Sequence, residues 1–407
     1  MPRITPFESW LVTQQHASRV VSPAYDAVSP KERREFAREN PDNFLNTMRL
    51  MEDFPEDGRP GQGELLQINR QTLERILDSG SFARLAEPSL FAYQLDSGNH
   101  VQTGIVCEVP VEEYDQGKIR KHENTLQDKE SLLAQYLEVV GVSSSPICLA
   151  YPRCEQIDRV VSGICDESAD LSFTSFDDVH QRIWRISDPK LHDRLGELFR
   201  GIEVSYLTDG HHRAASGSRY SRMMHERPDD SRHRLLVVLF PDNQLRLLPF
   251  HRCVRDLNDK TAGQILDELS RDFRVTRLDS DSFAASRHGQ FGLLLDDVWY
   301  RLDIKQEIRA DANPVDRLDA TILQNLVLDP VFGIKDMRND PRLDYVPDVG
   351  GMDVIRDKVA DGWPAILVLH AASIDQLMAV ADANELMPPK STYFDPKPRS
   401  GIFIRER

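Results

Sequence analysis

The sequence has few cysteines and no long apolar stretch. Its five cysteines are an odd number and show no Cys-x-x-Cys spacing, which argues against a disulfide framework and against a structural zinc site. The longest uncharged stretch, Val139 to Pro152, is far too short to cross a bilayer. Residues 1–6 carry no apolar signal core, so we expect a cytoplasmic protein without a membrane segment.

An excess of positive charge is also missing. The 407 residues include 50 Lys and Arg against 66 Asp and Glu, a formal net charge of -16. Because phosphate backbones are bound through clustered Lys and Arg, this balance disfavours nucleic acid as a partner. The length predicts two or three packed units, and we place a main α/β unit at 1–258 and a C-terminal α/β unit at 259–407. The oligomeric state stays open.

Apolar runs of helical and strand spacing alternate along the chain, separated by cap and turn signals. They predict a short strand from Val20 that runs into a loop by Val28, helices at 30–39, 64–78, 132–140, 213–226, 261–273, 321–328 and 373–384, and strands at 89–94, 104–111, 146–151, 205–208, 235–240, 244–248, 291–304 and 365–369. Two strand pairs, 89–94 with 104–111 and 235–240 with 244–248, are predicted hairpins. The mixture favours an α+β fold with mixed sheets over a regular doubly wound sheet.

The junction between the strand at 205–208 and the next helix is the most informative segment. The free N–H groups of a first helical turn and the positive end of the helix dipole attract an anion, and a glycine there lets a phosphate approach the backbone. This junction supplies such a glycine together with an acid and further donors: Asp209, Gly210, His211, His212 and Arg213. It predicts a phosphate-binding site.

Two other interpretations of the same residues remain open. In the first, the two histidines cap a helix and Asp209 binds an N–H of the turn, with no ligand at all. In the second, the histidines bind a metal ion, although adjacent histidines at a helix start point in different directions and no second histidine cluster is evident.

A second polar segment, residues 118–130, combines basic residues with a His-Glu pair. Glu123 is suited to act as general base on a substrate hydroxyl, while Lys121 and His122 hold a phosphate or carboxylate. Taken alone, the segment is equally typical of a solvated charge run that leads into a helix at 127–138. Two separate anion-binding segments in so acidic a protein favour the functional interpretation.

A third candidate lies near the C-terminus, at 387–397. Its three prolines restrict the backbone to an extended path, along which Lys390, Ser391, Thr392 and Lys397 are spaced to face an anionic ligand. We expect residues 121–123 to lie in the same cleft as 209–213, with residues 388–397 lining or closing it. The alternative is an extended segment packed on the surface.

Six blocks in the same order along the chain resemble the bacterial and archaeal family known as domain of unknown function 1015. These blocks are Arg3–Phe7, Ser22–Ser29, Asn40–Leu45, Lys121–Thr125, Leu207–Arg213 and Met387–Thr392. The chain departs from that family at two places, with Ser131-Leu132 in place of an Asp-Arg pair and Pro249-Phe250-His251-Arg252 in place of Tyr-Asn-Arg.

Residues 209–213 are also similar to the Asp-Gly-x-His-Arg element of the ParB/sulfiredoxin superfamily, which includes free-serine kinases. The resemblance implies a ParB/sulfiredoxin-like unit whose strand, turn and helix hold nucleotide phosphates. It therefore implies ATP or ADP, with Mg²⁺, as cofactors, and a small hydroxyl compound such as L-serine as substrate.

Two functions follow from these residues. In the first, the protein transfers a phosphoryl group between a nucleotide and a small hydroxyl metabolite such as serine or phosphoserine, in either direction. Its catalytic residues would be Glu123, His122 and Asp209, with Asp209 also as the Mg²⁺ ligand. The phosphate would be bound by Gly210, His211, His212, Arg213, Lys121 and Lys390. In the second, a nucleotide-binding regulatory or partner-binding protein of ParB-like type uses the same site without catalysis.

Overall fold

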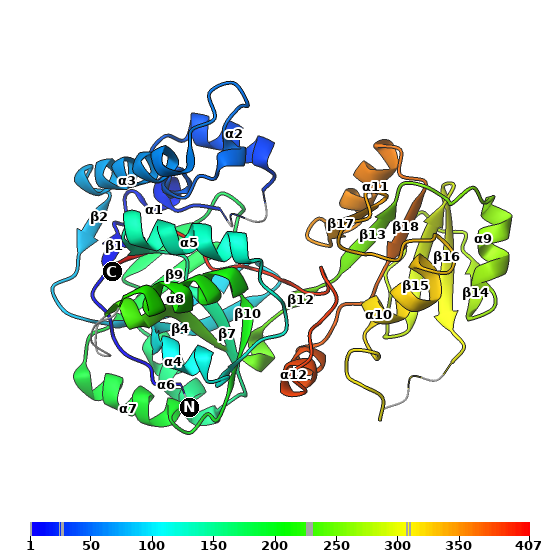
Figure 1. Ribbon diagram of the computed structural model, residues 1–407. Helices are drawn as coiled ribbons and strands as arrows, with labels where there is room; N and C mark the ends of the chain where they lie inside the picture. The colour runs from blue at the N-terminus through cyan, green and yellow to red at the C-terminus, as the bar shows by residue number, and fades with distance from the viewer. Residues whose placement is uncertain (1, 24, 26–27, 225–230, 307, 309–310) are drawn as a thin grey trace. The chain divides into compact units, whose positions relative to one another are not determined.

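The computed structural model describes residues 2–23, 25, 28–224, 231–306, 308 and 311–407 (Figure 1). The chain forms two compact units: Met1–Leu245 together with Pro396–Arg407, and Arg246–Asp395. The prediction assigned residues 1–258 to the first unit. The division lies earlier because β13 (Phe250–Val254) pairs with β17 (Leu343–Pro347) and β18 (Ala365–Val368), within the second unit. The last residues of the chain return to the first unit.

The first unit is built on an eight-stranded mixed sheet in the order β5-β10-β7-β11-β4-β3-β9-β8, with a four-stranded sheet in the order β2-β1-β20-β6. Its strands are β1 (Trp10–Val12), β2 (Phe82–Arg84), β3 (Leu90–Asp96), β4 (Val101–Pro110), β5 (Ile119–Arg120), β6 (Val142–Ser143), β7 (Ile147–Tyr151), β8 (Leu171–Thr174), β9 (His180–Ile186), β10 (Ser205–Asp209), β11 (Arg234–Pro241) and β20 (Phe403–Glu406). Its helices are α1 (Ala17–Val20), α2 (Pro30–Glu39), α3 (Gln62–Asp78), α4 (Val111–Asp115), α5 (Gln127–Val139), α6 (Glu155–Cys165), α7 (Pro189–Phe199) and α8 (His211–Met223), with short 3₁₀ turns η2 (Phe44–Thr47), η3 (Met51–Asp53), η4 (Ser231–His233) and η5 (Asp242–Gln244).

Both faces of the large sheet are buried, because in its central strands the side chains on either face are apolar. In β4, Ile105 and Val106 belong to different core clusters. The Val106 face packs against the small sheet and α3, through residues such as Phe403 and Leu73. The Ile105 face packs against helices that include α6, α7 and α8. The unit is therefore layered, and α8 begins directly beside the sheet.

The second unit has a six-stranded sheet in the order β14-β16-β15-β18-β13-β17 and a two-stranded pair, β12-β19. Besides β13, β17 and β18, its elements are β12 (Leu247–Leu248), β14 (Phe273–Arg277), β15 (Gln290–Leu295), β16 (Val298–Ile304), β19 (Tyr393–Phe394), α9 (Ala262–Leu269), α10 (Asp319–Leu323), a π-helical turn η6 (Gln324–Leu328), α11 (Met352–Ala360) and α12 (Ile374–Asp382). Leu269 of α9 and Ile355 of α11 belong to separate core clusters, so helices cover both faces of this sheet as well.

The predicted α+β class is confirmed, and so are the hairpin of β3 and β4 and the capped helix α2, where Ser29 and Glu32 form a capping box. Two predictions are wrong. The residues around Val20 end helix α1 and do not form a strand. Residues 244–248 do not pair with β11, because β11 already lies between β4 and β7, and β12 pairs with β19. The predicted helix end at Glu226 and the family-block residues Ala24, Asp26 and Ala27 lie outside the described residues.

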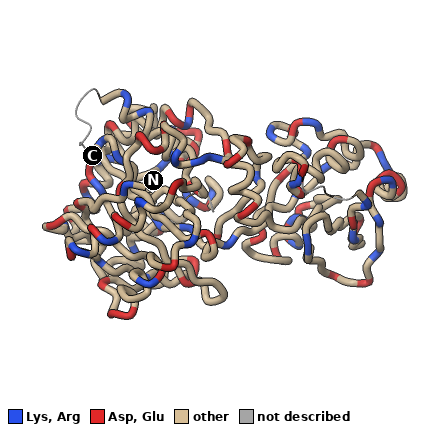
Figure 2. The backbone as a smooth tube through the Cα atoms, turned by 90° about the horizontal axis from the view of Figure 1, so that it is seen from below, with Lys and Arg blue, Asp and Glu red and all other residues tan. Residues whose placement is uncertain are grey.

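Figure 2 shows basic and acidic positions intermixed along the backbone of each unit. Within the described residues, no helix combines the length and the apolar character needed to cross a bilayer.

Candidate active site

Parallel strand pairing brings the two predicted polar segments together. β5 pairs with β10 in the register Ser205 with Ile119 and Tyr206 with Arg120. Parallel strands end at the same edge of a sheet, so the residues that follow β5 lie beside those that follow β10. The segments 121–123 and 209–213 therefore meet at one edge of the eight-stranded sheet, although about 90 residues separate them in sequence.

The turn between β10 and α8 requires a glycine. Gly210 has φ 95°, in the left-handed region, and a Cβ atom there would lie 2.8 Å from Nη2 of Arg213. Gly210 at the N-cap of α8 has no side chain to cap the first turn, so N–H groups of this turn can donate to another acceptor. The register of β10 against β7 shifts between Leu207 and Asp209, a bulge that alters the direction in which the end of the strand points.

Asp209 lies between two cations. Its Oδ2 accepts a hydrogen bond from Nη2 of Arg213 at 2.7 Å, and its Oδ1 accepts one from Nζ of Lys397 at 3.1 Å. Burial alone would raise the pKa of Asp209, but the charges of Lys397 and Arg213 outweigh it and hold the pKa well below its usual value. The trio is thus an anion with two cations, a net positive group at the start of α8.

This arrangement bears on the predicted Mg²⁺ site. Both carboxylate oxygens of Asp209 already accept hydrogen bonds from cations, so neither is directed only at a metal ion. Mg²⁺ is bound through oxygen ligands at short, regular distances, which these cations would have to vacate. The geometry therefore favours a positioning role for Asp209, which holds Lys397 and Arg213 in place. It disfavours the predicted role of Asp209 as a metal ligand.

Two of the site's histidines form a buried pair. His122 is 2% exposed and His211 is 5% exposed, and their ring centroids lie 4.5 Å apart in an edge-to-face arrangement. Burial lowers the pKa of His122 to about 4, although the backbone of Leu207 and the charge of Asp209 oppose the shift. Burial, reinforced by His122, also takes the pKa of His211 well below its usual value. Both rings are therefore neutral at pH 7.

His212 points elsewhere, as expected for adjacent histidines at a helix start. Its Nε2 accepts a hydrogen bond from the backbone N–H of Leu126 at 3.1 Å, so the proton of the neutral ring sits on Nδ1. Burial is the main cause that lowers the pKa of His212, and the nearby Lys129 acts in the same direction. His212 thus joins α8 to the start of α5.

Glu123 provides the exposed carboxylate of the site. Its side chain is 53% exposed, and its Oε2 lies 3.6 Å from Nδ1 of His211. Glu123, His122 and His211 each offer a ligand atom, and these atoms lie within 4.8 Å of one another. No second histidine cluster is evident in the sequence, and the pairing of β5 with β10 brings His122 from the other polar segment beside His211. The chemistry of this set is that of a nitrogen-rich metal site.

The two predicted lysines are placed differently. Lys121 is exposed, and its ammonium group lies over the Tyr114 ring at 4.8 Å from the centroid. Lys390 belongs to the second unit, where its ammonium group lies 5.2 Å from the centroid of the Phe250 ring. Lys121 makes no contact with Asp209 or Arg213 among the contacts of the described residues.

Lys397 is the site residue that the prediction underrated. It was named among the polar residues of 387–397 but not among the predicted phosphate-binding residues, yet its buried side chain reaches Asp209. Its backbone is held by neighbours: Gln102 donates to the carbonyl of Pro396 at 3.2 Å, and Arg399 donates to the carbonyl of Lys397 at 2.6 Å. The prolines around it indicated an ordered path, but the sequence did not single out Lys397 among the polar residues of that path.

Comparison with solved structures gives distant matches. A variant of free serine kinase in complex with ADP is 12% identical and has a TM-score of 0.38, with 74% of this chain and 92% of that chain covered. A conserved hypothetical protein from Pyrococcus furiosus matches at 12% identity and a TM-score of 0.38, with 74% and 95% covered. SbnI from Staphylococcus aureus, truncated at its C-terminus, matches at 10% identity and a TM-score of 0.36, with 72% and 85% covered.

No curated protein matches the chain significantly. The model of one protein family, described as protein of unknown function (DUF1015), matches residues 4–321, which is more than half of the chain. The match includes both polar segments of the candidate site. The chain belongs to the DUF1015 family.

Proposed function

We propose that the first unit binds a nucleotide such as ATP or ADP at the turn of Gly210 and transfers a phosphoryl group between it and a small hydroxyl metabolite. L-serine and phosphoserine are the first candidates, because residues 209–213 resemble the Asp-Gly-x-His-Arg element of the free-serine kinases. The observation that carries the proposal is the net positive group of Asp209, Lys397 and Arg213 at the uncapped start of α8.

The residues divide into two roles. Arg213 and Lys397 neutralise phosphate charge, and Asp209 holds both of them in place. Glu123 accepts the proton of the attacking hydroxyl in the forward direction, and it is exposed enough to reach a substrate. His122 is too deeply buried for direct contact, so we assign it to the support of His211. Mg²⁺ would enter with the nucleotide phosphates.

The test separates turnover from binding. Glu123→Gln keeps the shape of the side chain but removes the base, so it should lower turnover by about 10² to 10⁴ with nucleotide affinity nearly unchanged. Arg213→Ala should instead weaken nucleotide binding, because it removes donors to the phosphates. Both constants are measured for each variant with ATP and a panel of hydroxyl metabolites, serine first, and with ADP and phosphoserine.

Glu74→Gln is the matched control. Glu74 lies on α3, is 57% exposed and pairs with Arg70, so the same chemical change there should leave both constants unchanged. Full turnover by Glu123→Gln with every substrate of the wild type would refute the base assignment. Tight nucleotide binding by the wild type without any transfer would support the regulatory alternative.

A further inference from the structure

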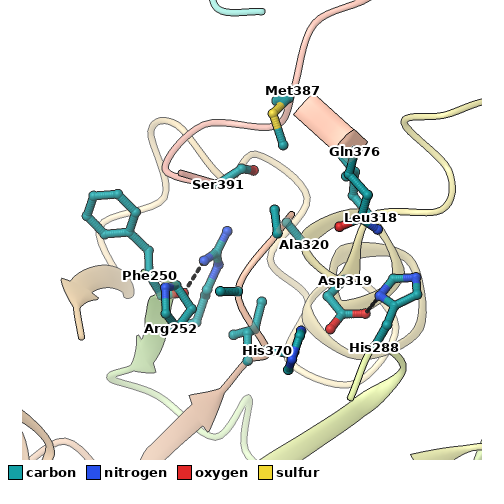
Figure 3. Close-up of a pocket in the computed structure, with 14 residues that line it drawn as sticks. Phe250, Arg252, His288, Leu318, Asp319, Ala320, His370, Gln376, Met387 and Ser391 are labelled. Carbon is teal, nitrogen blue, oxygen red and sulfur yellow. Dashed lines mark hydrogen bonds and ion pairs between the residues drawn. The ribbon is translucent and has the colours of Figure 1, made fainter. Parts of the chain in front are cut away.

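The second unit contains a pocket that the proposed function does not use (Figure 3). It lies beside the start of β13, the beginning of α10, the residues after β18 and helix α12. The volume open to the centre of a water molecule is about 20 Å³, enough for a small polar group but too little for a nucleotide. Its lining includes Phe250, Arg252, His288 and Asp319.

Arg252 is the unusual residue of this pocket. It is 1% exposed, and among the described residues no carboxylate forms an ion pair with it. Burial lowers the pKa of Arg252 to about 10, which still leaves the side chain charged at pH 7. The face of the Tyr345 ring, 5.0 Å from Cζ, provides partial compensation. Arginine is rarely buried without a partner, so the burial of Arg252 indicates a site for a ligand.

The hydrogen bonds of the guanidinium group indicate which kind of ligand would bind there. Nη1 donates to the carbonyl of Phe250, whereas Nε and Nη2 are buried and find no hydrogen-bond partner among the residues that the structure describes. Nε and Nη2 share one edge of the planar group, and their N–H bonds point the same way. That edge is the fork that binds two oxygens of a carboxylate or phosphate.

The other polar wall of the pocket is formed by His288 and Asp319. Nδ1 of His288 lies 2.5 Å from Oδ1 of Asp319, and the same oxygen accepts a hydrogen bond from the backbone N–H of Gly289 at 2.9 Å. Oδ2 of Asp319 is buried and has no hydrogen-bond partner in the described part of the chain. This free acceptor would repel a second anionic group and would bind a hydroxyl or ammonium donor.

We propose that this pocket binds a small metabolite that carries an oxyanion, either a carboxylate or a phosphate, and a hydrogen-bond donor. The oxyanion takes the Nε and Nη2 edge of Arg252, and the donor faces Asp319. The residues of this pocket all belong to the second unit, and the proposal does not rest on the function proposed for the first.

Calorimetric titration of the full chain tests the proposal, with inorganic phosphate, acetate and glycolate as probes and chloride at equal ionic strength as the blank. At least one oxyanion should bind at a saturable site that Arg213→Ala retains. Arg252→Lys keeps the charge without the fork and should weaken binding at least ten-fold. Arg252→Met should weaken it at least 100-fold. Glycolate should bind more tightly than acetate, because only glycolate supplies a hydroxyl for Asp319.

Arg255→Met is the matched control. Arg255 follows β13, is exposed and donates to the carbonyl of Asp361, so the same substitution there should leave oxyanion binding unchanged. Absence of saturable binding for both phosphate and the carboxylates in the wild type would overturn the proposal, whatever the folding of the variants. Binding to Arg252→Met at wild-type affinity would overturn it too. Equal affinity for acetate and glycolate would overturn the part of the proposal in which the ligand carries a hydrogen-bond donor for Asp319.

Discussion

Each unit holds a buried cation, and the two are compensated in different ways. In the first unit, Lys397 and Arg213 share the carboxylate of Asp209. In the second unit, Arg252 has a carbonyl and an aromatic face but no carboxylate partner among the described residues. A charge that is compensated within the chain supports the fold, whereas an uncompensated charge is stabilised only when a ligand arrives. Mutation should therefore change the free energy of unfolding much more at the first site than at the second.

The largest effect is expected for Asp209→Asn. The variant keeps the shape of the side chain but leaves the buried Lys397 and the half-buried Arg213 without their anion. Removal of one partner of a buried ion pair is strongly destabilising, so the free energy of unfolding should fall by about 3 kcal/mol. Urea denaturation at pH 7 measures it.

Asp42→Asn is the control for this variant. Asp42 also lies between two cations, with Arg19 at 3.1 Å and Arg75 at 2.6 Å, but both arginines are more than half exposed. Exposed pairs contribute little, so the loss there should stay below about 1 kcal/mol. Because the pKa of Asp209 is lowered in the folded state, its contribution is present above about pH 4 and is lost as the pH falls further. Equal losses of unfolding free energy for Asp209→Asn and Asp42→Asn would refute the claim that Asp209 compensates buried cations.

A second effect follows from the buried histidines of the first unit. The pKa of His122 falls from 6.5 to about 4 on folding, so the unfolded chain binds more protons between these values. Stability should therefore fall as the pH drops from 7 to 5, by about 2 kcal/mol for His122. Urea denaturation at several pH values measures the slope, which His122→Asn should reduce. An unchanged slope would show that His122 is not the titrating group.

The local part of the first site follows from neighbouring residues, whereas residues 121–123 and 388–397 were expected beside it without any local signal for that placement. A strand, Asp209, Gly210 and a helix follow one another in sequence, so the turn could be inferred, although α8 begins two residues before the predicted helix. β5 is only two residues long and precedes a charge run, so nothing local predicts its parallel pairing with β10. The side chain of Lys397 reaches Asp209 through a return of the chain that depends on long-range contacts.

The second site was hidden for a different reason. Arg252 sits in a short segment whose composition gives no sign of burial, and arginine is mostly found at the surface. It is buried because β13 is an interior strand of the six-stranded sheet, between β18 and β17. Strand order depends on pairing between residues that are about 100 apart in the chain, which periodicity does not reveal.

A third and smaller effect is expected for Gly210→Ala. The left-handed conformation costs a non-glycine residue about 1 kcal/mol, and the new Cβ would also displace the Arg213 guanidinium. Gly98→Ala is the control, because Gly98 has φ 82° but open space around its Cβ position. Both variants should lose similar stability, but only Gly210→Ala should lose the rise in Tm on addition of ATP and Mg²⁺. An intact rise would place the nucleotide elsewhere.

The smallest effect is expected for Arg252→Met, measured without added oxyanion. The substitution removes a buried charge that no carboxylate compensates, and this gain offsets the lost contacts with the Phe250 carbonyl and the Tyr345 ring. The free energy of unfolding should change by less than about 1 kcal/mol, as it should for Arg255→Met. Addition of the oxyanion that binds in calorimetry should then stabilise the wild type and Arg255→Met but leave Arg252→Met unchanged. A loss of about 3 kcal/mol without oxyanion would mean that Arg252 is compensated within the fold, as Lys397 and Arg213 are, and the contrast between the two units would disappear.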